Sequence, residues 1–242
     1  MTLSRIHIAA SLAPDTTIDL PEQTGHYLNR VLRLSAGDSL IAFNREGAYQ
    51  ATVLHARGAN ATLRIGEALS LVTESPLATR LVQGLCRGPR MDYCIQKATE
   101  LGVQCITPVI TDRCVVRLDA RRRAKRTAHW QAVAVSACEQ SGRTRVPTVD
   151  EPVAFDAVLS GESGELAILD ADQGAPYPAW SRPKGRLSLL IGPEGGLTEG
   201  EIERATDAGA QRWRMGPRVM RTETAGVVAL ALAQTKWGDL GT

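Results

Sequence analysis

Hydrophobic and polar residues alternate over several short stretches near the start of the chain, with the two-residue period of a strand that is buried on one face. Gly, Asp and Asn residues separate these stretches, as they do in turns between short strands. Residues 22–34 differ, because their apolar side chains recur at helical spacing. We therefore expect residues 1–73 to form a small β-barrel domain with one helix packed on it. The expected strands cover residues 5–10, 16–20, 39–43, 49–55 and 61–65.

A second pattern begins after Pro76, where apolar runs alternate with amphipathic segments. Such alternation is typical of a mostly parallel sheet that helices cover on both faces. Residues 77–242 are therefore expected to form one α/β domain. The apolar runs predict strands over residues 79–85, 105–110, 166–170, 187–191 and 211–215. The amphipathic segments predict helices over residues 91–101, 119–140, 198–208 and 224–237.

Composition narrows the class of protein. The 242 residues are 43% hydrophobic and 22% charged, which argues against disordered, collagen-like and disulfide-scaffold proteins. The five cysteines lack the C-x-x-C spacing of zinc and redox motifs, so we expect no metal. The longest apolar run, residues 225–233, is too short for a membrane span, and residues 1–20 lack the apolar centre of a secretory signal. These features predict a cytoplasmic protein with no membrane partner.

Charge is distributed unevenly along the chain. The formal net charge is +2, yet residues 76–150 hold 13 Lys and Arg against 6 Asp and Glu. The cationic run at 121–126 alone is usually a solvated helix face. Further arginines lie near the ends of predicted strands, however, so several segments bring basic groups to one region, which favours an anion-binding surface. These further residues are Arg87, Arg90, Arg113 and Arg117.

A glycine-rich loop follows the predicted strand 187–191. Its sequence is GPEGGLT, and Thr198 with Glu201 forms a capping box that opens the next helix. Glycines let a ligand approach backbone N–H and C=O groups closely, and ligands of open α/β sheets lie beyond the carboxyl ends of the strands. A tight turn without a ligand is the alternative. The loop matches neither the Walker A pattern nor G-x-G-x-x-G, which weakens a phosphate-loop or ordinary dinucleotide site.

A second loop has the same placement after the predicted strand 211–215. Residues 216–225 read GPRVMRTETA and lead into an alanine-rich helix that Thr222 or Glu223 is placed to cap. Met215 and Met220 offer soft apolar contacts to a flat ring or a thioether. Glu223 alone could be a solvated carboxylate at a helix N-terminus. The pairing of two strand-end loops favours one shared ligand.

These segments, in this order, resemble the ribosomal RNA small subunit methyltransferase E family, within the SPOUT superfamily of trefoil-knotted methyltransferases. The resemblance covers nearly the whole chain, and the only departures noted are Met215 and Met220 where leucine is usual, a swap that conserves volume. The segments that carry it are 26–33 (HYLNRVLR), 96–103 (QKATELGV), 139–143 (EQSGR), 191–197 (IGPEGGL) and 215–225 (MGPRVMRTETA).

The resemblance implies a fold and an activity. The fold is a SPOUT α/β-knot with a deep C-terminal trefoil knot, a rare topology, preceded by a PUA-like RNA-binding barrel. The activity is transfer of a methyl group from S-adenosylmethionine to N3 of a uridine in 16S rRNA, in the decoding region of the assembled 30S subunit. The resemblance also implies a homodimer in which a second subunit completes the active site. Methylation of another RNA position and a non-catalytic RNA-binding assembly factor are the alternatives.

The resemblance and the loop chemistry together assign candidate residues. Methyl transfer needs a base for the uridine N3 proton and a cation for the developing anion, so Glu139 or Glu223 is the candidate base and Arg143 or Arg221 the candidate cation. Glu194 either braces its loop or contacts the ligand. The expected cofactor contacts are Leu169, Ile191, Gly192, Gly195, Gly196, Met215, Gly216, Val219, Met220, Arg221, Thr222, Glu223, Thr224 and Ala225. The expected RNA contacts are Arg5, His26, Arg30, Arg33, Arg87, Arg90, Arg121, Arg122, Arg123, Arg143 and Arg145.

Overall fold

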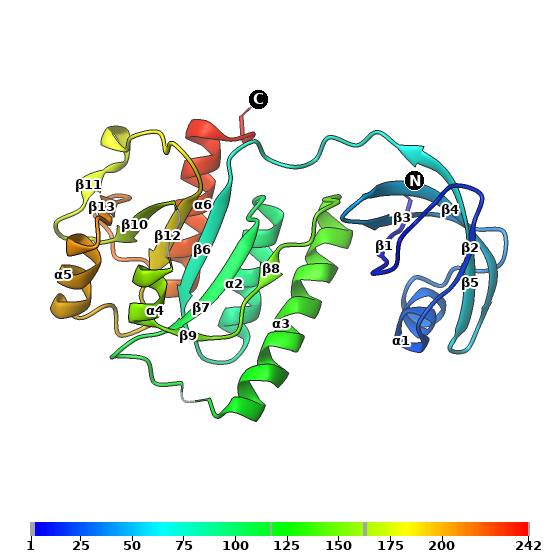
Figure 1. The fold of residues 1–242 in the computed structure, drawn as a ribbon, viewed down its shortest axis with the longest axis horizontal. Helices are drawn as coiled ribbons and strands as arrows, with labels where there is room; N and C mark the ends of the chain where they lie inside the picture. Colours follow the sequence, from blue (N-terminus) through cyan, green and yellow to red (C-terminus); the bar gives the residue numbers. More distant parts are fainter. Residues whose placement is uncertain (1–2, 117, 162–163, 242) are drawn as a thin grey trace. The chain divides into compact units, whose positions relative to one another are not determined.

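A computed structural model describes residues 3–116, 118–161 and 164–241 of the chain (Figure 1). Arg117, one of the arginines near predicted strand ends, lies outside the described residues. The chain forms two compact units. The first contains the residues up to Glu74 together with Cys138–Val146, and the second contains Ser75–Ala137 and the residues from Pro147 onward.

The first unit is built on a five-stranded sheet in the order β1-β3-β4-β5-β2. β1 pairs with β3 in parallel and the other pairs are antiparallel. Alternate side chains such as Ile6, Leu40 and Leu63 are fully buried, as the two-residue period predicts. All five expected strands are present, with shifted ends. They are β1 (Arg5–His7), β2 (Thr17–Asp19), β3 (Ser39–Asn44), β4 (Gly47–Arg57) and β5 (Asn60–Leu69).

The helix predicted over residues 22–34 is shorter and less regular than expected. It consists of α1 (Glu22–His26) followed directly by the π-helical turn η1 (Tyr27–Val31). Leu28 is fully buried and anchors the turn on the sheet. The chain leaves it through Arg33, whose φ of 55° is left-handed, which ends the helical periodicity one turn early.

The second unit is built on an eight-stranded sheet in the order β11-β13-β10-β12-β6-β7-β8, with β9 paired to β7. Every strand pair in it is parallel, which confirms the predicted mostly parallel sheet. The strands are β6 (Thr79–Gly84), β7 (Cys105–Ile110), β8 (Thr148–Val149), β9 (Val153–Ala154), β10 (Glu165–Leu169), β11 (Ala175–Pro176), β12 (Leu187–Ile191) and β13 (Gln211–Arg214).

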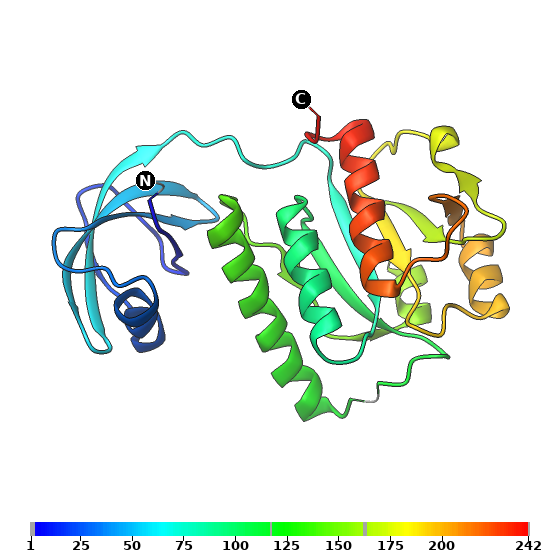
Figure 2. The ribbon, with the colours of Figure 1, turned by 180° about the vertical axis from the view of Figure 1, so that it is seen from behind.

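Helices cover both faces of this sheet (Figures 1 and 2). α4 (Phe155–Ser160) and α5 (Glu199–Asp207) pack on one face, where Phe155, Val158 and Ala205 join apolar residues of β6, β7, β10 and β12 in one core. α2 (Pro89–Glu100) and α6 (Thr222–Trp237) pack against each other, and α6 contacts β6 and β12. The short α4 was not predicted, because six residues hold too little of the helical period. The remaining elements are α3 (Ala120–Ser141) and the 3₁₀ turn η2 (Tyr177–Ala179).

The division into units differs from the predicted domains 1–73 and 77–242. The end of α3 and the loop after it belong to the first unit, where Cys138 and Val146 pack with Phe43, Ala48 and Leu69. The Glu74 carboxylate accepts hydrogen bonds from the backbone N–H groups of residues 144 and 145, 3.0 Å each. Local periodicity cannot reveal this return of the chain, because its contacts join residues far apart in the sequence.

Candidate functional site

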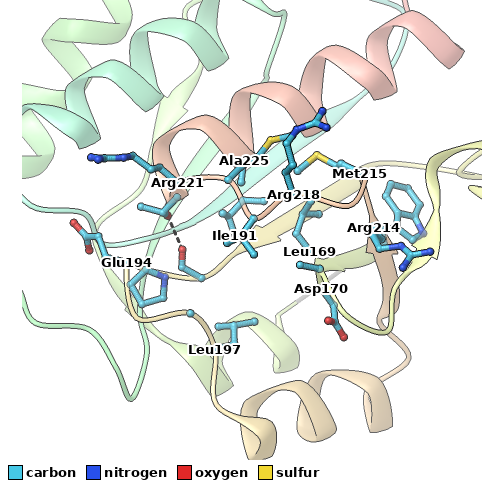
Figure 3. Close-up of a pocket in the computed structure, with 18 of the residues that line it drawn as sticks. Leu169, Asp170, Ile191, Glu194, Leu197, Arg214, Met215, Arg218, Arg221 and Ala225 are labelled. Carbon is cyan, nitrogen blue, oxygen red and sulfur yellow. Dashed lines mark hydrogen bonds between the residues drawn. The ribbon is translucent and has the colours of Figure 1, made fainter.

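A cavity of about 560 Å³ lies at the carboxyl ends of β10, β12 and β13, wholly within the second unit (Figure 3). The two predicted strand-end loops form most of its wall. Figure 3 shows Glu194 on one side, Asp170 and Arg214 on the other, and apolar side chains between them. The lining residues are Arg90, Leu169, Asp170, Ala171, Asp172, Ile191, Gly192, Pro193, Glu194, Gly196, Leu197, Ile202, Trp213, Arg214, Met215, Gly216, Arg218, Val219, Met220, Arg221, Thr222, Glu223 and Ala225.

The first loop is shaped by close backbone packing. A Cβ atom on Gly84, at the end of β6, would lie only 2.6 Å from the carbonyl carbon of Gly192, so only glycine allows the two backbones to meet. The loop ends in the predicted capping box, in which Thr198 and Glu201 exchange backbone and side-chain hydrogen bonds. Glu201 is fully buried and also accepts a hydrogen bond from the Asp112 backbone N–H. These contacts fix the loop from both ends.

The second loop is tied to the first by a hydroxyl group. Thr222 Oγ1 donates a hydrogen bond to the Gly192 carbonyl oxygen and accepts one from Gln83 Nε2. The expected cap by Thr222 or Glu223 was wrong, since α6 begins after Arg221 and no side chain caps it. The hydroxyl instead links the loops, because it pairs with the buried Gln83 side chain of β6 and with the Gly192 carbonyl just after β12.

Carboxylates and a guanidinium meet at one side of the cavity. Glu194 Oε1 accepts hydrogen bonds of 3.1 Å from both the Arg87 backbone N–H and Arg90 Nη1. Burial raises the pKa of Glu194, but these donors outweigh it and the net pKa is lowered. Arg90 Nε lies 3.6 Å from Glu223 Oε1, and Glu223 Oε2 is buried without a hydrogen-bond partner. This side of the cavity therefore has an unsatisfied acceptor.

The opposite side is organised by an ion pair between Asp170 and Arg212. Asp170 also accepts hydrogen bonds from the backbone N–H groups of Asp172 and Gln173, which turn the chain after β10. Burial alone would raise the pKa of Asp170, yet the Arg212 guanidinium and the two N–H groups together lower it. Trp213 stacks on Trp180 with ring centroids 4.3 Å apart, so a second aromatic ring supports this wall from behind.

Most of the expected cofactor residues line the cavity, but two do not. Gly195 faces the side chain of Arg113, which a Cβ would meet at 3.0 Å, and Thr224 is exposed on the first turn of α6. Sequence reasoning missed Asp170 and Trp213. Asp170 follows an apolar strand directly, which is the same strand-end signal that identified the two loops.

The four catalytic candidates divide between the units. Arg221 and Glu223 line the cavity, whereas Glu139 and Arg143 belong to the first unit. Glu139 Oε1 accepts a hydrogen bond of 3.0 Å from the His7 backbone N–H, and burial raises the pKa of its carboxyl despite that bond and one from Tyr27. The Arg143 side chain is 4% exposed and forms an ion pair of 2.7 Å with Glu74. The geometry therefore gives Arg143 a structural contact within the first unit.

The expected RNA contacts also differ in exposure. The Arg5 guanidinium donates to the Arg143 carbonyl oxygen and lies 5.0 Å from the Phe43 ring centroid, and burial lowers its pKa. His26 is half-buried and its Nδ1 has no hydrogen-bond partner. Arg90 lines the cavity, and Arg123 is half-buried with Nε donating to the Leu118 carbonyl oxygen. The exposed members are Arg30, Arg33, Arg87, Arg121, Arg122 and Arg145.

Neither a membrane span nor a metal site is present in the described residues. No helix in the described part of the chain is long and apolar enough to cross a membrane. Within residues 3–116, 118–161 and 164–241, no group of three or more His, Cys, Asp or Glu side chains could hold a metal ion.

Comparison with known proteins identifies both units. Residues 73–234 match the model of an RNA methyltransferase domain, and residues 20–66 match that of an RNA methyltransferase PUA domain. The ribosomal RNA small subunit methyltransferase E of Bacillus subtilis is 31% identical over 232 residues, which cover 89% of this chain and 88% of that protein.

Solved structures agree in fold over nearly the full length. A methyltransferase from Legionella pneumophila in complex with S-adenosylmethionine is 33% identical with a TM-score of 0.96, covering 99% of this chain and 100% of that one. The ribosomal RNA small subunit methyltransferase E of Neisseria gonorrhoeae, bound to S-adenosylmethionine, is 37% identical with a TM-score of 0.92, covering 98% and 99%. The chain therefore belongs to the ribosomal RNA small subunit methyltransferase E family, and its fold is that of the SPOUT methyltransferases preceded by a PUA-like domain.

Proposed function

We propose that this protein transfers a methyl group from S-adenosylmethionine to N3 of a uridine in 16S rRNA, in the decoding region of the assembled 30S subunit, and so forms 3-methyluridine. The cavity between the two strand-end loops is the observation that carries the proposal, since it lies in the part of the chain that matches the RNA methyltransferase domain. Two solved relatives of the same fold are described as bound to this cofactor.

The lining residues fit S-adenosylmethionine chemically. Leu169, Ile191 and Met215 offer an apolar wall for a flat adenine ring, and the glycine-rich loops expose backbone groups that can hydrogen-bond to it. Glu223 offers a carboxylate whose Oε2 has no partner, which suits a ligand with positive charge. When bound, the cofactor supplies an electrophilic methyl group on a sulfonium sulfur, so the reaction is an in-line displacement that needs no metal.

The protein must hold uridine N3 in line with that methyl group and take up its proton. Of the two candidate bases, Glu223 is supported by its position in the cavity wall, and Arg221 of the same loop is the cation best supported for the developing uracil anion. Glu139, with its raised pKa, and Arg143 stay as alternative candidates in the first unit. Holding the nucleophile in line with the methyl group favours the transfer, because the reacting atoms no longer have to meet by chance.

RNA binding is assigned to the exposed arginines on both units. Phosphate contacts supply affinity, whereas the uridine is selected after it leaves its base stack, because N3 lies on its Watson–Crick edge. The exposed residues that support this role are Arg30, Arg33, Arg87, Arg121, Arg122 and Arg145. The proposal includes a cytoplasmic location and a homodimer in which a second copy completes each active site.

Nucleoside mass spectrometry tests the activity directly. Purified protein is incubated with S-adenosylmethionine and 30S subunits that lack the modification, and digested 16S rRNA is analysed. We expect 3-methyluridine at one site. Another methylated nucleoside would redirect the proposal to a different RNA position.

Two further measurements test cofactor binding and the proposed homodimer. Titration calorimetry with S-adenosylmethionine should give saturable heat, and its absence would favour a non-catalytic RNA-binding factor. Light scattering after size-exclusion chromatography should give a dimer mass.

A further inference from the structure

Arg90 lies in the first turn of α2 and forms part of the cavity wall, although its charge and sequence position first suggested an RNA contact. Its guanidinium is directed at two carboxylates from different segments, Glu194 in the loop after β12 and Glu223 in the first turn of α6. Nη1 lies 3.1 Å from Glu194 Oε1, and Nε lies 3.6 Å from Glu223 Oε1. One side chain of α2 thus connects the loop after β12 to the start of α6.

The Glu194 end of this bridge is firmly held. Its Oε1 accepts both the Arg90 side chain and the Arg87 backbone N–H, and the carboxylate therefore stays charged at neutral pH, with its pKa lowered. Figure 3 shows Glu194 at the edge of the cavity, on the loop that contains Gly192. A fixed carboxylate at this point gives Arg90 a defined direction.

The Glu223 end depends on Arg90. The Glu223 side chain is 14% exposed, and Arg90 is the one cation that pairs with it among the described residues. Its other oxygen, Oε2, is buried without a partner. A largely buried carboxylate that loses its ion-pair partner is left as an uncompensated charge, which is strongly unfavourable.

We infer that Arg90 is a positioning residue of the cavity: it joins the two loops and holds the Glu223 carboxylate ready for the cationic methyl donor. The inference rests on the proposed function and extends it to a residue outside both glycine-rich motifs. Arg87 offers the contrast, because it contributes its backbone N–H to Glu194 while its exposed side chain forms no hydrogen bond or ion pair with the other described residues.

The test compares Arg90→Met with Arg87→Met, which removes the same charge three residues away. Titration calorimetry measures the Kd for S-adenosylmethionine in the absence of RNA. We expect Arg90→Met to weaken binding roughly five- to tenfold, as for a partly buried ion pair, and Arg87→Met to leave the Kd within about twofold. Arg90→Lys should restore part of the loss. In steady-state assays the KM for S-adenosylmethionine should rise for Arg90→Met while the KM for 30S subunits stays unchanged.

A double-mutant cycle with Glu194 shows whether Arg90 acts on cofactor binding through its bridge between the Glu194 and Glu223 carboxylates. In a Glu194→Gln background, Arg90→Met should weaken cofactor binding by only about twofold, because the bridge is already broken. Thermal unfolding of each variant identifies global loss of structure. If Arg90→Met is unfolded, the Kd of Arg90→Lys is compared with that of wild type instead. Equal Kd values for wild type and Arg90→Met, or lost RNA affinity with intact cofactor binding, would overturn the inference. Wild-type protein that binds no S-adenosylmethionine would instead overturn the proposed function.

Discussion

Thr222 Oγ1 donates a hydrogen bond of 2.5 Å to the carbonyl oxygen of Gly192 and so links the two loops of the cavity. The same oxygen accepts a hydrogen bond of 2.8 Å from Gln83 Nε2. Thr222 is 6% exposed, so removal of the hydroxyl leaves its two partners with little access to water. One atom therefore satisfies a donor of β6 and an acceptor at the end of β12.

Replacing Thr222 by valine keeps the shape of the side chain and removes this oxygen. The free energy of unfolding should fall by about 1–3 kcal/mol, the cost of leaving buried polar groups unpaired, and cofactor affinity should fall with it. Urea unfolding and titration calorimetry measure the two effects. Thr235→Val is the matched control, since Thr235 is exposed on the same helix and its hydroxyl donates to the Ala231 carbonyl oxygen one turn earlier. Equal losses in both variants would contradict the linking role of Thr222.

Close backbone packing at Gly84 predicts a second effect. A methyl group at this position would meet the backbone of Gly192 and Pro193, which cannot move without displacing the loop. Gly84→Ala should weaken S-adenosylmethionine binding by about tenfold or more, equivalent to at least 1.4 kcal/mol. A Cβ on Gly185 would meet nothing within 4 Å, so Gly185→Ala should bind normally. An unchanged Kd in Gly84→Ala would show that the loop tolerates displacement.

The ion pair of Asp170 and Arg212 predicts a pH-dependent effect on stability. Because the pKa of Asp170 is lowered in the folded protein, its contribution is complete above the unfolded pKa of about 3.9 and is lost as the pH falls through the lower folded value. Asp170→Asn should reduce the free energy of unfolding by about 1–2 kcal/mol at pH 7, because Arg212 is partly exposed. The difference from wild type should shrink below about pH 4. A difference that grows as the pH falls would reverse the assigned sign.

Arg30 and Arg33 predict a separable effect on RNA. Both are exposed on the first unit, Arg30 within η1 and Arg33 just after it, and both lie outside the cavity wall. Replacing both by alanine should weaken RNA binding and reduce the slope of log K against log salt by about 0.7–0.9 for each lost phosphate contact. Cofactor affinity should stay unchanged. A variant with Arg57 and Arg64 replaced carries the same charge change on β4 and β5. If it loses as much RNA affinity, net charge rather than the η1 surface explains the binding.

Much of the fold could be predicted because its signals are local. The two-residue period before Pro76 and the alternation of apolar runs after it correspond to the two observed sheets. The glycine-rich loops were found for the same reason, since strand, loop and capping box follow one another in the sequence. Whether the chain is knotted stays a prediction from the family resemblance.

Long-range contacts could not be predicted from local patterns. Arg90 resembled a surface cation in sequence, yet two carboxylates more than a hundred residues away engage it. The loop at 142–146 resembled part of the second domain, but Cys138 and Val146 pack in one cluster with Phe43, which assigns the loop to the first unit. In both cases the deciding interaction joins residues that are too far apart in the sequence for a local pattern to include both.

Glu223 predicts that the cavity distinguishes the methyl donor from its product. S-adenosylmethionine has a positively charged sulfonium, whereas S-adenosylhomocysteine has a neutral thioether, so a nearby carboxylate favours the donor. Glu223→Gln keeps the size of the side chain and removes its charge. It should weaken S-adenosylmethionine binding by about tenfold and S-adenosylhomocysteine binding by about twofold, as expected for loss of a charged partner. Titration calorimetry with both ligands measures the ratio.

The matched control for Glu223→Gln is Glu203→Gln, an exposed carboxylate on α5 outside the cavity wall, which should bind both ligands normally. The ratio matters more than either Kd, because a general loosening of α6 would weaken both ligands alike. Equal losses of affinity for the two ligands would therefore mean that Glu223 acts only by holding the loop through Arg90. If only the affinity for S-adenosylmethionine falls, the carboxylate acts on the positive charge of the sulfonium. S-adenosylhomocysteine lacks that charge, because its sulfur is a neutral thioether after the methyl group has left.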